Sequence, residues 1–136
     1  MKKRGFSLVE IALIILVILI VMSLGIYAWK ESVEAAKASR AKSEISVMAS
    51  AISQYRYELG HFPASINVLA DKDGQYGPWI TKEMADSPDP WQNKYLYVKA
   101  NDNSSYIIYS FGPDKKDNGS NLTNGIMDGD IGFKGR

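Results

Sequence analysis

The chain contains no cysteine, only one histidine and almost no net charge. The lack of cysteine excludes a disulfide framework, a thiolate zinc site and a cysteine nucleophile. The 16 basic and 15 acidic residues give a formal net charge of +1, so the excess of positive charge expected of a nucleic-acid-binding protein is missing. The single histidine, His61, belongs to no recognisable nucleophile–base pattern, and no glycine-rich phosphate loop occurs. The sequence therefore does not indicate an enzyme.

Charged residues are also scarce between Phe6 and Trp29, where Glu10 and Tyr27 are the only ionisable side chains. Residues 11–22, IALIILVILIVM, contain no polar side chain at all. As a helix, the segment that ends at Trp29 would rise about 36 Å, which is enough to span a hydrocarbon layer of about 30 Å. The sequence therefore predicts one membrane-spanning helix near the N-terminus.

The residues that flank this segment indicate its orientation. Lys2, Lys3 and Arg4 precede it, so the positive-inside rule places the N-terminus in the cytoplasm and everything after Lys30 outside. A secretory signal peptide is one alternative, but its apolar region is usually only about 7–15 residues long and is followed by a small-residue cleavage site. A plain signal anchor is the stronger alternative, because it accounts for both the length and the flanking residues.

Glu10 and Gly5 argue against a plain anchor. Glu10 lies one helical turn inside the apolar segment, where an ionised carboxylate costs about 2.5–3.5 kcal/mol on insertion scales. No lysine, arginine or histidine occurs between Phe6 and Trp29. A cationic partner must therefore come from outside this segment, or the carboxyl group is protonated. Gly5 is a small, flexible residue between the basic cluster and the first apolar side chain.

A single helix is expected to continue beyond the membrane, because no proline occurs before Pro63. Its apolar residues then fall on one face, at Ile45, Met48, Ala49, Ile52, Tyr55 or Arg56, and Leu59. The opposite face carries Lys37, Arg40, Lys42, Glu44, Gln54 and Glu58. Gly60 and Pro63 end the helix. From Phe6 to Leu59 it would be about 80 Å long. The apolar stripe is too short for a coiled coil, so we expect it to pack on a small C-terminal domain.

The C-terminal part of the chain predicts a small antiparallel sheet. Two segments rich in β-branched and aromatic residues, Lys94–Lys99 and Ser105–Phe111, are separated by a turn cluster and predict a hairpin. A third short strand is expected at Ile131–Lys134. Ser65–Ala70 and Thr81–Asp86 are each long enough for one helical turn. The predicted fold class is α+β, with one long helix packed on this sheet.

The C-terminal loop combines carboxylates with glycines. Asp114, Asp117, Asp128 and Asp130 are interleaved with five glycines. Oxygen ligands on a flexible loop suit Ca²⁺. The spacing is not that of an EF-hand, because Lys116 and Gly125 occupy two of its ligand positions. On composition alone, a solvated polar loop remains the alternative.

The N-terminal residues KKRGFSLVEI resemble the class III signal of type IV pilins and of type II secretion pseudopilins, in which a basic leader ending in glycine precedes Phe-(Ser/Thr)-Leu-(Val/Ile)-Glu. The resemblance implies that a prepilin peptidase cleaves between Gly5 and Phe6 and methylates the new Phe6 amine. It also implies that Glu10 pairs with an N-terminal amine, either its own or that of a neighbouring subunit in a filament.

Two further segments resemble the major pseudopilin of type II secretion. Residues 87–97, SPDPWQNKYLY, are similar to its Asp-Pro-Trp-Gly-Asn-Pro-Tyr segment, although Gln92 and Lys94 replace the usual glycine and proline. Residues 59–63, LGHFP, are similar to its helix exit. Trp91 is interpreted as a structural core or lid residue.

The acidic ending is similar to the loop with which that family binds Ca²⁺. The resemblance implies Asp114 and Asp130 as the main side-chain ligands, Asp128 as the next and the Phe111 carbonyl as a further donor. Lys115 and Lys116 replace the family's Gly-x and leave Asp117 the weakest member of the set.

The resemblance implies four parts. These are a leader at residues 1–5, a membrane and filament-core helix at 6–29, an amphipathic helix at 30–60, and a periplasmic or extracellular domain at 61–136. The expected protein is a major-pseudopilin-like subunit, single-pass in the bacterial inner membrane, that polymerises into a short periplasmic filament driving protein export. Its implied partners are its own copies, minor pseudopilins, the prepilin peptidase and the inner-membrane assembly platform. One alternative is a type IV pilin, but pilins commonly carry a C-terminal disulfide. The other is a membrane-anchored binding module that never polymerises.

Overall fold

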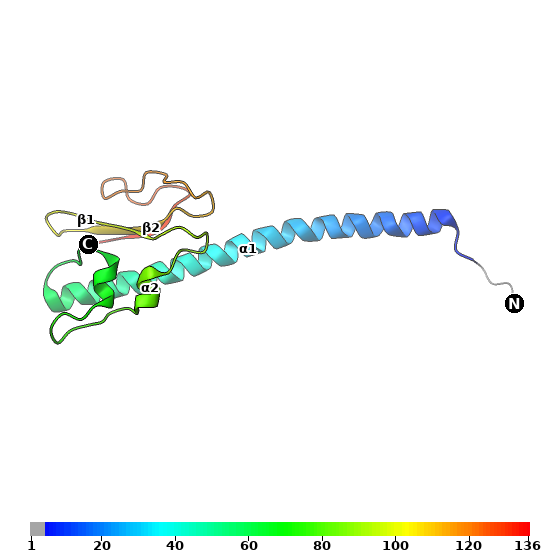
Figure 1. Cartoon of the computed structure of the whole chain (residues 1–136). Helices are drawn as coiled ribbons and strands as arrows, with labels where there is room; N and C mark the ends of the chain where they lie inside the picture. The colour runs from blue at the N-terminus through cyan, green and yellow to red at the C-terminus, as the bar shows by residue number, and fades with distance from the viewer. Residues whose placement is uncertain (1–4) are drawn as a thin grey trace. The chain divides into compact units, whose positions relative to one another are not determined.

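The computed structural model describes residues 5–136, apart from the side chains of Tyr27 and Ala28. Residues up to Ala35 form one compact unit and Ala36–Arg136 form the other, and the long helix runs through both. The expectations for Lys2, Lys3 and Arg4 lie outside the described residues. In chain order the elements are α1 Leu8–Leu59, the 3-10 helix η1 Ile66–Ala70, α2 Lys82–Asp86, β1 Leu96–Lys99, β2 Tyr106–Ser110 and β3 Ile131–Gly135 (Figure 1). The predicted α+β class is confirmed.

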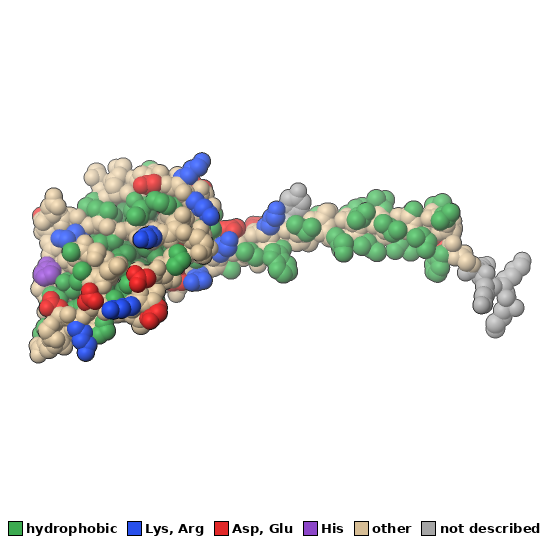
Figure 2. Space-filling model, viewed as in Figure 1, with side chains coloured by type: hydrophobic (Ala, Val, Ile, Leu, Met, Phe, Trp, Pro, Cys, Tyr) green, Lys and Arg blue, Asp and Glu red, His purple; other side chains and the backbone are tan. Residues whose placement is uncertain are grey.

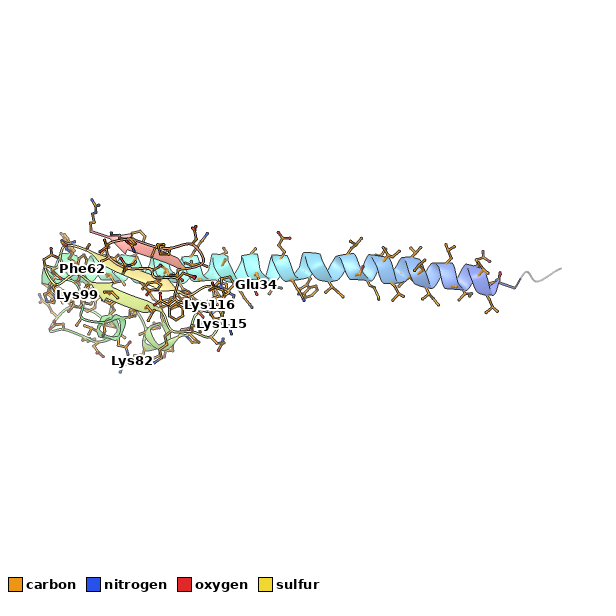
Figure 3. The ribbon with its side chains drawn as sticks, turned by 90° about the horizontal axis from the view of Figure 1, so that it is seen from above. Glu34, Phe62, Lys82, Lys99, Lys115 and Lys116 are labelled. Atoms are coloured by element: carbon orange, nitrogen blue, oxygen red, sulfur yellow. The ribbon has the colours of Figure 1, made fainter. Side chains whose placement is uncertain are left out.

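The N-terminal part of α1 exposes apolar side chains on all sides. The helix starts at Leu8, two residues later than expected, because Ser7 caps it: the Ser7 Oγ accepts a hydrogen bond from the Val9 N–H at 3.4 Å. Hydrophobic side chains cover its visible face and project around it in stick view (Figures 2 and 3). In the part of the chain that the structure describes, α1 is the one helix long and apolar enough to cross a membrane, a test that a signal sequence also passes.

The second half of α1 buries the predicted stripe. Ile45, Met48, Ala49, Ile52 and Tyr55 are all buried, and Leu59 packs at the edge of the core. The sequence left Tyr55 and Arg56 as alternatives for one position of the stripe. Tyr55 faces the core, whereas the Arg56 guanidinium lies 4.3 Å from the centre of the Phe62 ring. Gly60 has a φ of 80° and its N–H donates to the Arg56 carbonyl at 2.8 Å. The predicted helix end is therefore confirmed.

Two residues assigned to the solvated face of α1 make tertiary contacts instead. Glu44 accepts a hydrogen bond from the Tyr95 hydroxyl at 2.6 Å, and Glu58 accepts one from the indole N–H of Trp79 at 2.7 Å. Both glutamates border the buried stripe, so chain segments that cover the stripe also reach them. Helical periodicity separates faces but does not show how far a covering loop extends around the helix.

The sheet is antiparallel with strand order β1-β2-β3, as predicted. The register pairs Lys99 with Tyr106 in the hairpin and Ser110 with Ile131 across β2 and β3. The Tyr106 side chain faces α1, since its hydroxyl donates to the Ala49 carbonyl at 3.3 Å. The stripe of α1 therefore covers one face of the sheet. The two short helical turns and the third strand expected from the sequence are also present.

The other face of the sheet is covered by the loop that joins β2 to β3, which was not expected. Every residue of β2 is buried, including Ile107 and Tyr109, which alternate with Tyr106 and so point away from α1. Figure 1 shows the loop on the side of the sheet opposite α1. A Cβ added to Gly132 would lie 2.5 Å from both the Ile126 side chain and the Tyr109 Cβ, so the loop packs directly on the strands. The C-terminal loop is thus a second covering layer.

Candidate functional site

The predicted processing and assembly residues lie at the exposed start of α1. Gly5 and Phe6 precede the helix, and Phe6 is 72% exposed. Glu10 lies in the first turn of α1 and is exposed. The partial positive charge of a helix N-terminus stabilises a carboxylate in the first turn. Within the described residues Glu10 forms no ion pair.

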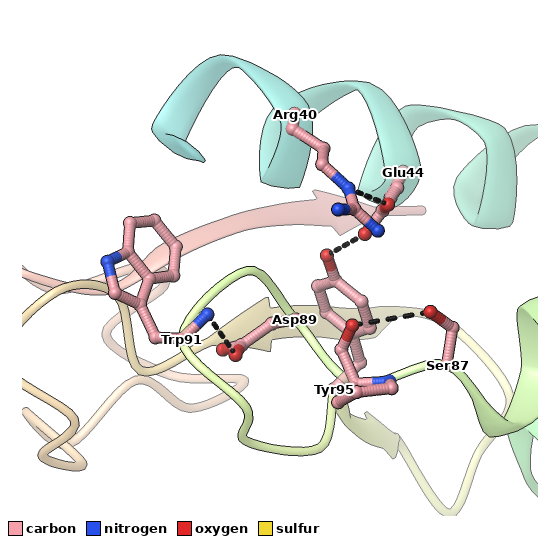
Figure 4. A network of polar contacts seen from close by, with 7 residues as sticks. Arg40, Glu44, Ser87, Asp89, Trp91 and Tyr95 are labelled. Atoms are coloured by element: carbon pink, nitrogen blue, oxygen red, sulfur yellow. Dashed lines mark hydrogen bonds and ion pairs between the residues drawn. The ribbon is translucent and has the colours of Figure 1, made fainter. Parts of the chain in front are cut away.

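A buried carboxylate organises the segment before β1. Asp89 is 1% exposed, and one of its oxygens, Oδ1, accepts hydrogen bonds from the backbone N–H groups of Trp91 (2.9 Å) and Asn93 (2.8 Å). Its other oxygen accepts from the Ser110 hydroxyl, which lies on β2. Figure 4 shows the bond from the Trp91 N–H to Asp89. The bonds to Asp89 fold residues 89–93 into a turn, in which Trp91 is buried. The interpretation of Trp91 as a structural residue is therefore confirmed.

Tyr95 ties the same segment to α1. Glu44 accepts the Tyr95 hydroxyl on one oxygen and the Arg40 Nε–H on the other, at 2.6 and 2.7 Å (Figure 4). Burial is the main cause that raises the pKa of the Tyr95 phenol, and the hydrogen bond to the Glu44 carboxylate raises it further. The phenol therefore stays protonated and continues to donate to Glu44.

Two of the predicted calcium ligands come together around one amide. The Asn118 side-chain nitrogen donates to Asp114 Oδ2 at 3.2 Å and to Asp130 Oδ1 at 3.3 Å. The Asn118 backbone N–H also donates to Asp130 Oδ1, at 3.4 Å. The Ser120 hydroxyl donates to the second oxygen of Asp130, which is only 8% exposed. Residues that are sixteen positions apart in the sequence thus face the same side chain.

The other predicted ligands are placed less closely. Asp117 is exposed and accepts the Gly119 N–H at 2.9 Å, and Asp128 lies in an exposed turn closed by a bond from the Asp130 N–H to the Met127 carbonyl. Among the described residues, no three acidic or histidine side chains form a group suited to a metal. The Phe111 ring lies 6.2 Å from that of Tyr109. Burial, and then the Asp117 and Asp130 charges, raise the pKa of the Tyr109 phenol.

The donor set suits a hard cation in its chemistry. Asp114 and Asp130 supply carboxylate oxygens on a glycine-rich loop. A Cβ on Gly112 would lie 2.3 Å from the Gly129 carbonyl oxygen, so the two ends of the loop approach each other. These residues fit Ca²⁺ better than a metal that prefers sulfur or imidazole.

Sequence reasoning missed Asn118 and Ser120, which hold Asp130, and Ser110, which holds Asp89. The Ser110 hydroxyl also accepts the Gly112 N–H at 3.0 Å and so connects the Asp89 turn with the start of the C-terminal loop. The Asp114–Asn118 spacing of four residues was a local signal. No local signal in the sequence related Asn118 or Ser120 to Asp130.

The comparison with known proteins places the chain in a family. The sequence model of the family described as "Type II secretion system (T2SS), protein G" matches residues 29–129. The chain belongs to this family. The matched range contains the Asp89 turn and most of the C-terminal loop, and it begins at the end of the apolar segment. The predicted resemblance to the major pseudopilin is therefore confirmed.

Curated relatives extend over more of the chain. The type II secretion system core protein G of Escherichia coli K12 is 29% identical over 83% of this chain and 83% of its own. That of Pseudomonas aeruginosa is 28% identical over 96% and 94%, and that of Xanthomonas campestris pv. campestris is 27% identical over 91% and 88%. None of the solved structures compared matches the chain. The relatives are named as secretion-system core proteins and not as enzymes, in agreement with the prediction.

Proposed function

We propose that this chain is the major-pseudopilin-like structural subunit of a type II secretion system, which polymerises into a short periplasmic filament that drives protein export. The observation that carries the proposal is a helix whose first part exposes apolar side chains on all sides and carries Glu10 without an ion pair in the described residues. Membership of the protein G family supports this function over a surface pilus. Such a helix needs either lipid or other helices around it.

The assembly mechanism follows from the first turn of α1. Cleavage between Gly5 and Phe6 creates a new amine, methylated at Phe6, close to the start of the helix. The Glu10 carboxylate of one subunit then pairs with the Phe6 amine of its neighbour. Away from water, this attraction is several times stronger than at a protein surface. The pairing therefore sets the axial position of each subunit, while the apolar side chains pack into the filament core.

Location and partners follow from the same proposal. Before assembly the subunit is held in the bacterial inner membrane by residues 6–29, with its N-terminus in the cytoplasm and residues 61–136 in the periplasm. The prepilin peptidase processes it there, the inner-membrane assembly platform adds it to the filament, and minor pseudopilins are further partners.

A Glu10→Ala variant tests the mechanism. Removing the carboxylate is expected to abolish filaments, because no group then pairs with the neighbour's amine, while membrane insertion stays normal because the helix becomes more apolar. Filaments are counted by electron microscopy and insertion by membrane fractionation. Glu31→Ala, at a glutamate beyond the apolar segment, is the matched control and keeps its filaments. Normal filaments and export in Glu10→Ala would instead support an anchor that does not polymerise.

We further propose that Ca²⁺ orders the C-terminal loop, held mainly by Asp114 and Asp130. Asp128 and the Phe111 carbonyl complete the set, and Asp117 is its weakest member. A cation that binds only the folded loop stabilises it by about 2.7 kcal/mol at a concentration one hundred times its Kd. A chelator is therefore expected to lower the Tm of the full chain in detergent, and Ca²⁺ to restore it. An unchanged Tm would contradict the assignment.

A further inference from the structure

A groove of about 280 Å³ lies between α1 and β3 in the unit Ala36–Arg136. Figure 3 shows β3 alongside α1. Ala49 and Ser50 belong to the α1 wall of the groove, and Ile131 and Phe133 belong to the β3 wall. The Phe133 ring lies 6.2 Å from that of Tyr106, which faces α1, yet the Phe133 side chain is 46% exposed. A large apolar ring is therefore left partly uncovered beside the helix.

The hydroxyl groups on the α1 wall already have partners within the helix. The Ser50 hydroxyl donates to the Ser46 carbonyl at 2.9 Å, and the Ser53 hydroxyl donates to the Ala49 carbonyl at 2.9 Å. Lys42 is the one charged side chain among the described residues that line the groove. An occupant with polar side chains would lose water there and gain few hydrogen bonds, which costs free energy. The groove therefore suits an apolar occupant.

The same chain contains an apolar segment that needs to be covered. Residues 11–22 have no polar side chain, and Leu13 and Val17 are 61% and 50% exposed. This segment and the α1 wall of the groove belong to one continuous helix, Leu8–Leu59. The groove wall is thus continuous with the helix surface through which the copies are proposed to assemble. A filament of such copies brings many apolar segments and many grooves together.

From this match we propose that the groove between α1 and β3 binds residues 11–22 of a second copy. The inference rests on the proposed function, which places the groove in the periplasm. The segment that the groove binds has therefore left the lipid bilayer. Contacts with Phe133 and the small side chains of α1 then replace part of the lipid that covered the segment, so the groove lowers the cost of its extraction.

Disulfide cross-linking identifies the occupant, because the chain has no cysteine of its own. One tagged subunit carries Ser50→Cys, and a second subunit with another tag carries a cysteine at each of residues 11–22 in turn. Filaments are oxidised with copper phenanthroline, and dimers with both tags are measured by immunoblot. Reactive positions should recur every three to four residues, since a helix turns one face toward the groove. Gln54→Cys, at an exposed α1 residue outside the groove lining, is the control and should give few mixed dimers.

A charge placed in the groove tests whether assembly needs it. Ser50→Lys would bury an unpaired charge against the apolar segment, so we expect at least about tenfold fewer filaments by electron microscopy. Membrane insertion and urea unfolding should stay near wild type, because Ser50 is exposed in the single chain. Ser50→Ala keeps the wall small and should keep its filaments. Gln54→Lys adds the same charge outside the groove and should keep them as well.

The outcomes separate the groove from the proposed function. Filaments as numerous in Ser50→Lys as in wild type would overturn the groove contact and leave the proposed function intact. Equal loss in Gln54→Lys would also overturn it, because the added charge and not its place would then matter. Loss in Ser50→Lys alone, without mixed dimers at helical spacing, would show that lipid or another segment fills the groove. A wild-type chain that forms no filaments would overturn both proposals.

Discussion

Asp89 is nearly inaccessible to water, yet both oxygens of its carboxylate accept hydrogen bonds from the chain. Two backbone N–H groups and the Ser110 hydroxyl surround it, so its charge is stabilised by donors that the fold places there. Glu10 is the opposite case, an exposed carboxylate in an apolar segment without an ion pair in the described residues. The first arrangement fixes a turn, and the second leaves a group available for another molecule.

The Asp89 turn gives a stability prediction. Asp89→Ala leaves the Trp91 and Asn93 N–H groups buried without acceptors and is expected to lower the free energy of unfolding by about 2–4 kcal/mol. Asp89→Asn keeps an acceptor for these groups and should lose less. Urea unfolding of the full chain in detergent, followed by tryptophan fluorescence, measures both. Asp102→Ala, at an exposed turn, is the control and should stay near wild type. An Asp89→Ala variant as stable as wild type would show that the turn does not need the carboxylate.

At the scale of elements, local patterns in the sequence predicted most of the fold. The stripe from Ile45 to Leu59 has helical spacing, Gly60 adopts the positive φ that ends a helix, and the strands are rich in β-branched and aromatic residues. Each of these signals lies within a few residues of the element it predicts. The helix, the hairpin, the third strand and both short helices were therefore predicted correctly.

The contacts of the C-terminal loop were not predictable in the same way. Loop residues 111–130 have no regular spacing of apolar side chains, so the sequence did not show that they cover Ile107 and Tyr109. The meeting of Asp114 with Asp130 depends on how the loop folds back, and no local pattern records that. Predicting the Glu44–Tyr95 contact would likewise have required the path of the chain across the helix.

The Tyr95–Glu44 hydrogen bond joins the segment before β1 to α1. It predicts that the stability of the fold decreases at alkaline pH. Burial and Glu44 raise the pKa of Tyr95 above the ordinary 10.0. The folded chain therefore keeps this proton after the unfolded chain has lost it. The stabilising contribution is complete below pH 10 and decreases as the pH rises above that value. Tyr95→Phe should make the fall in stability between pH 10 and 11 shallower, as measured by urea unfolding at each pH. Tyr57→Phe, at a side chain that is 90% exposed, is the control. Equal slopes for wild type and Tyr95→Phe would contradict the argument.

At the scale of the whole molecule, the chain consists of two units with different surfaces. Residues up to Ala35 expose apolar side chains, whereas Ala36–Arg136 enclose a core and carry charges of both signs on the surface (Figure 2). The family match covers mainly the second unit. A single first unit in water cannot bury its apolar surface, because burial of that surface requires lipid or further copies. The proposed filament meets this requirement with the same chain.

Mixed filaments can show whether Glu10 pairs with its own amine or with that of a neighbour. A tagged Glu10→Ala subunit still has its Phe6 amine. If the pairing is between subunits, the Glu10 of an adjacent wild-type copy can bind this amine. The tagged subunit should then enter filaments made mostly of wild type and shorten them as its share rises, since each copy removes one pair.

If Glu10 instead neutralises its own amine, the variant carries an unpaired charge into the apolar core and should be excluded at every ratio. The tag is quantified in purified filaments by immunoblot, with a tagged wild-type subunit as the control. Exclusion of the variant at low ratios, with normal entry of the tagged control, would overturn pairing between subunits. Entry of the variant into filaments that become shorter would require pairing between subunits, because the carboxylate that binds the variant's amine is then supplied by another copy.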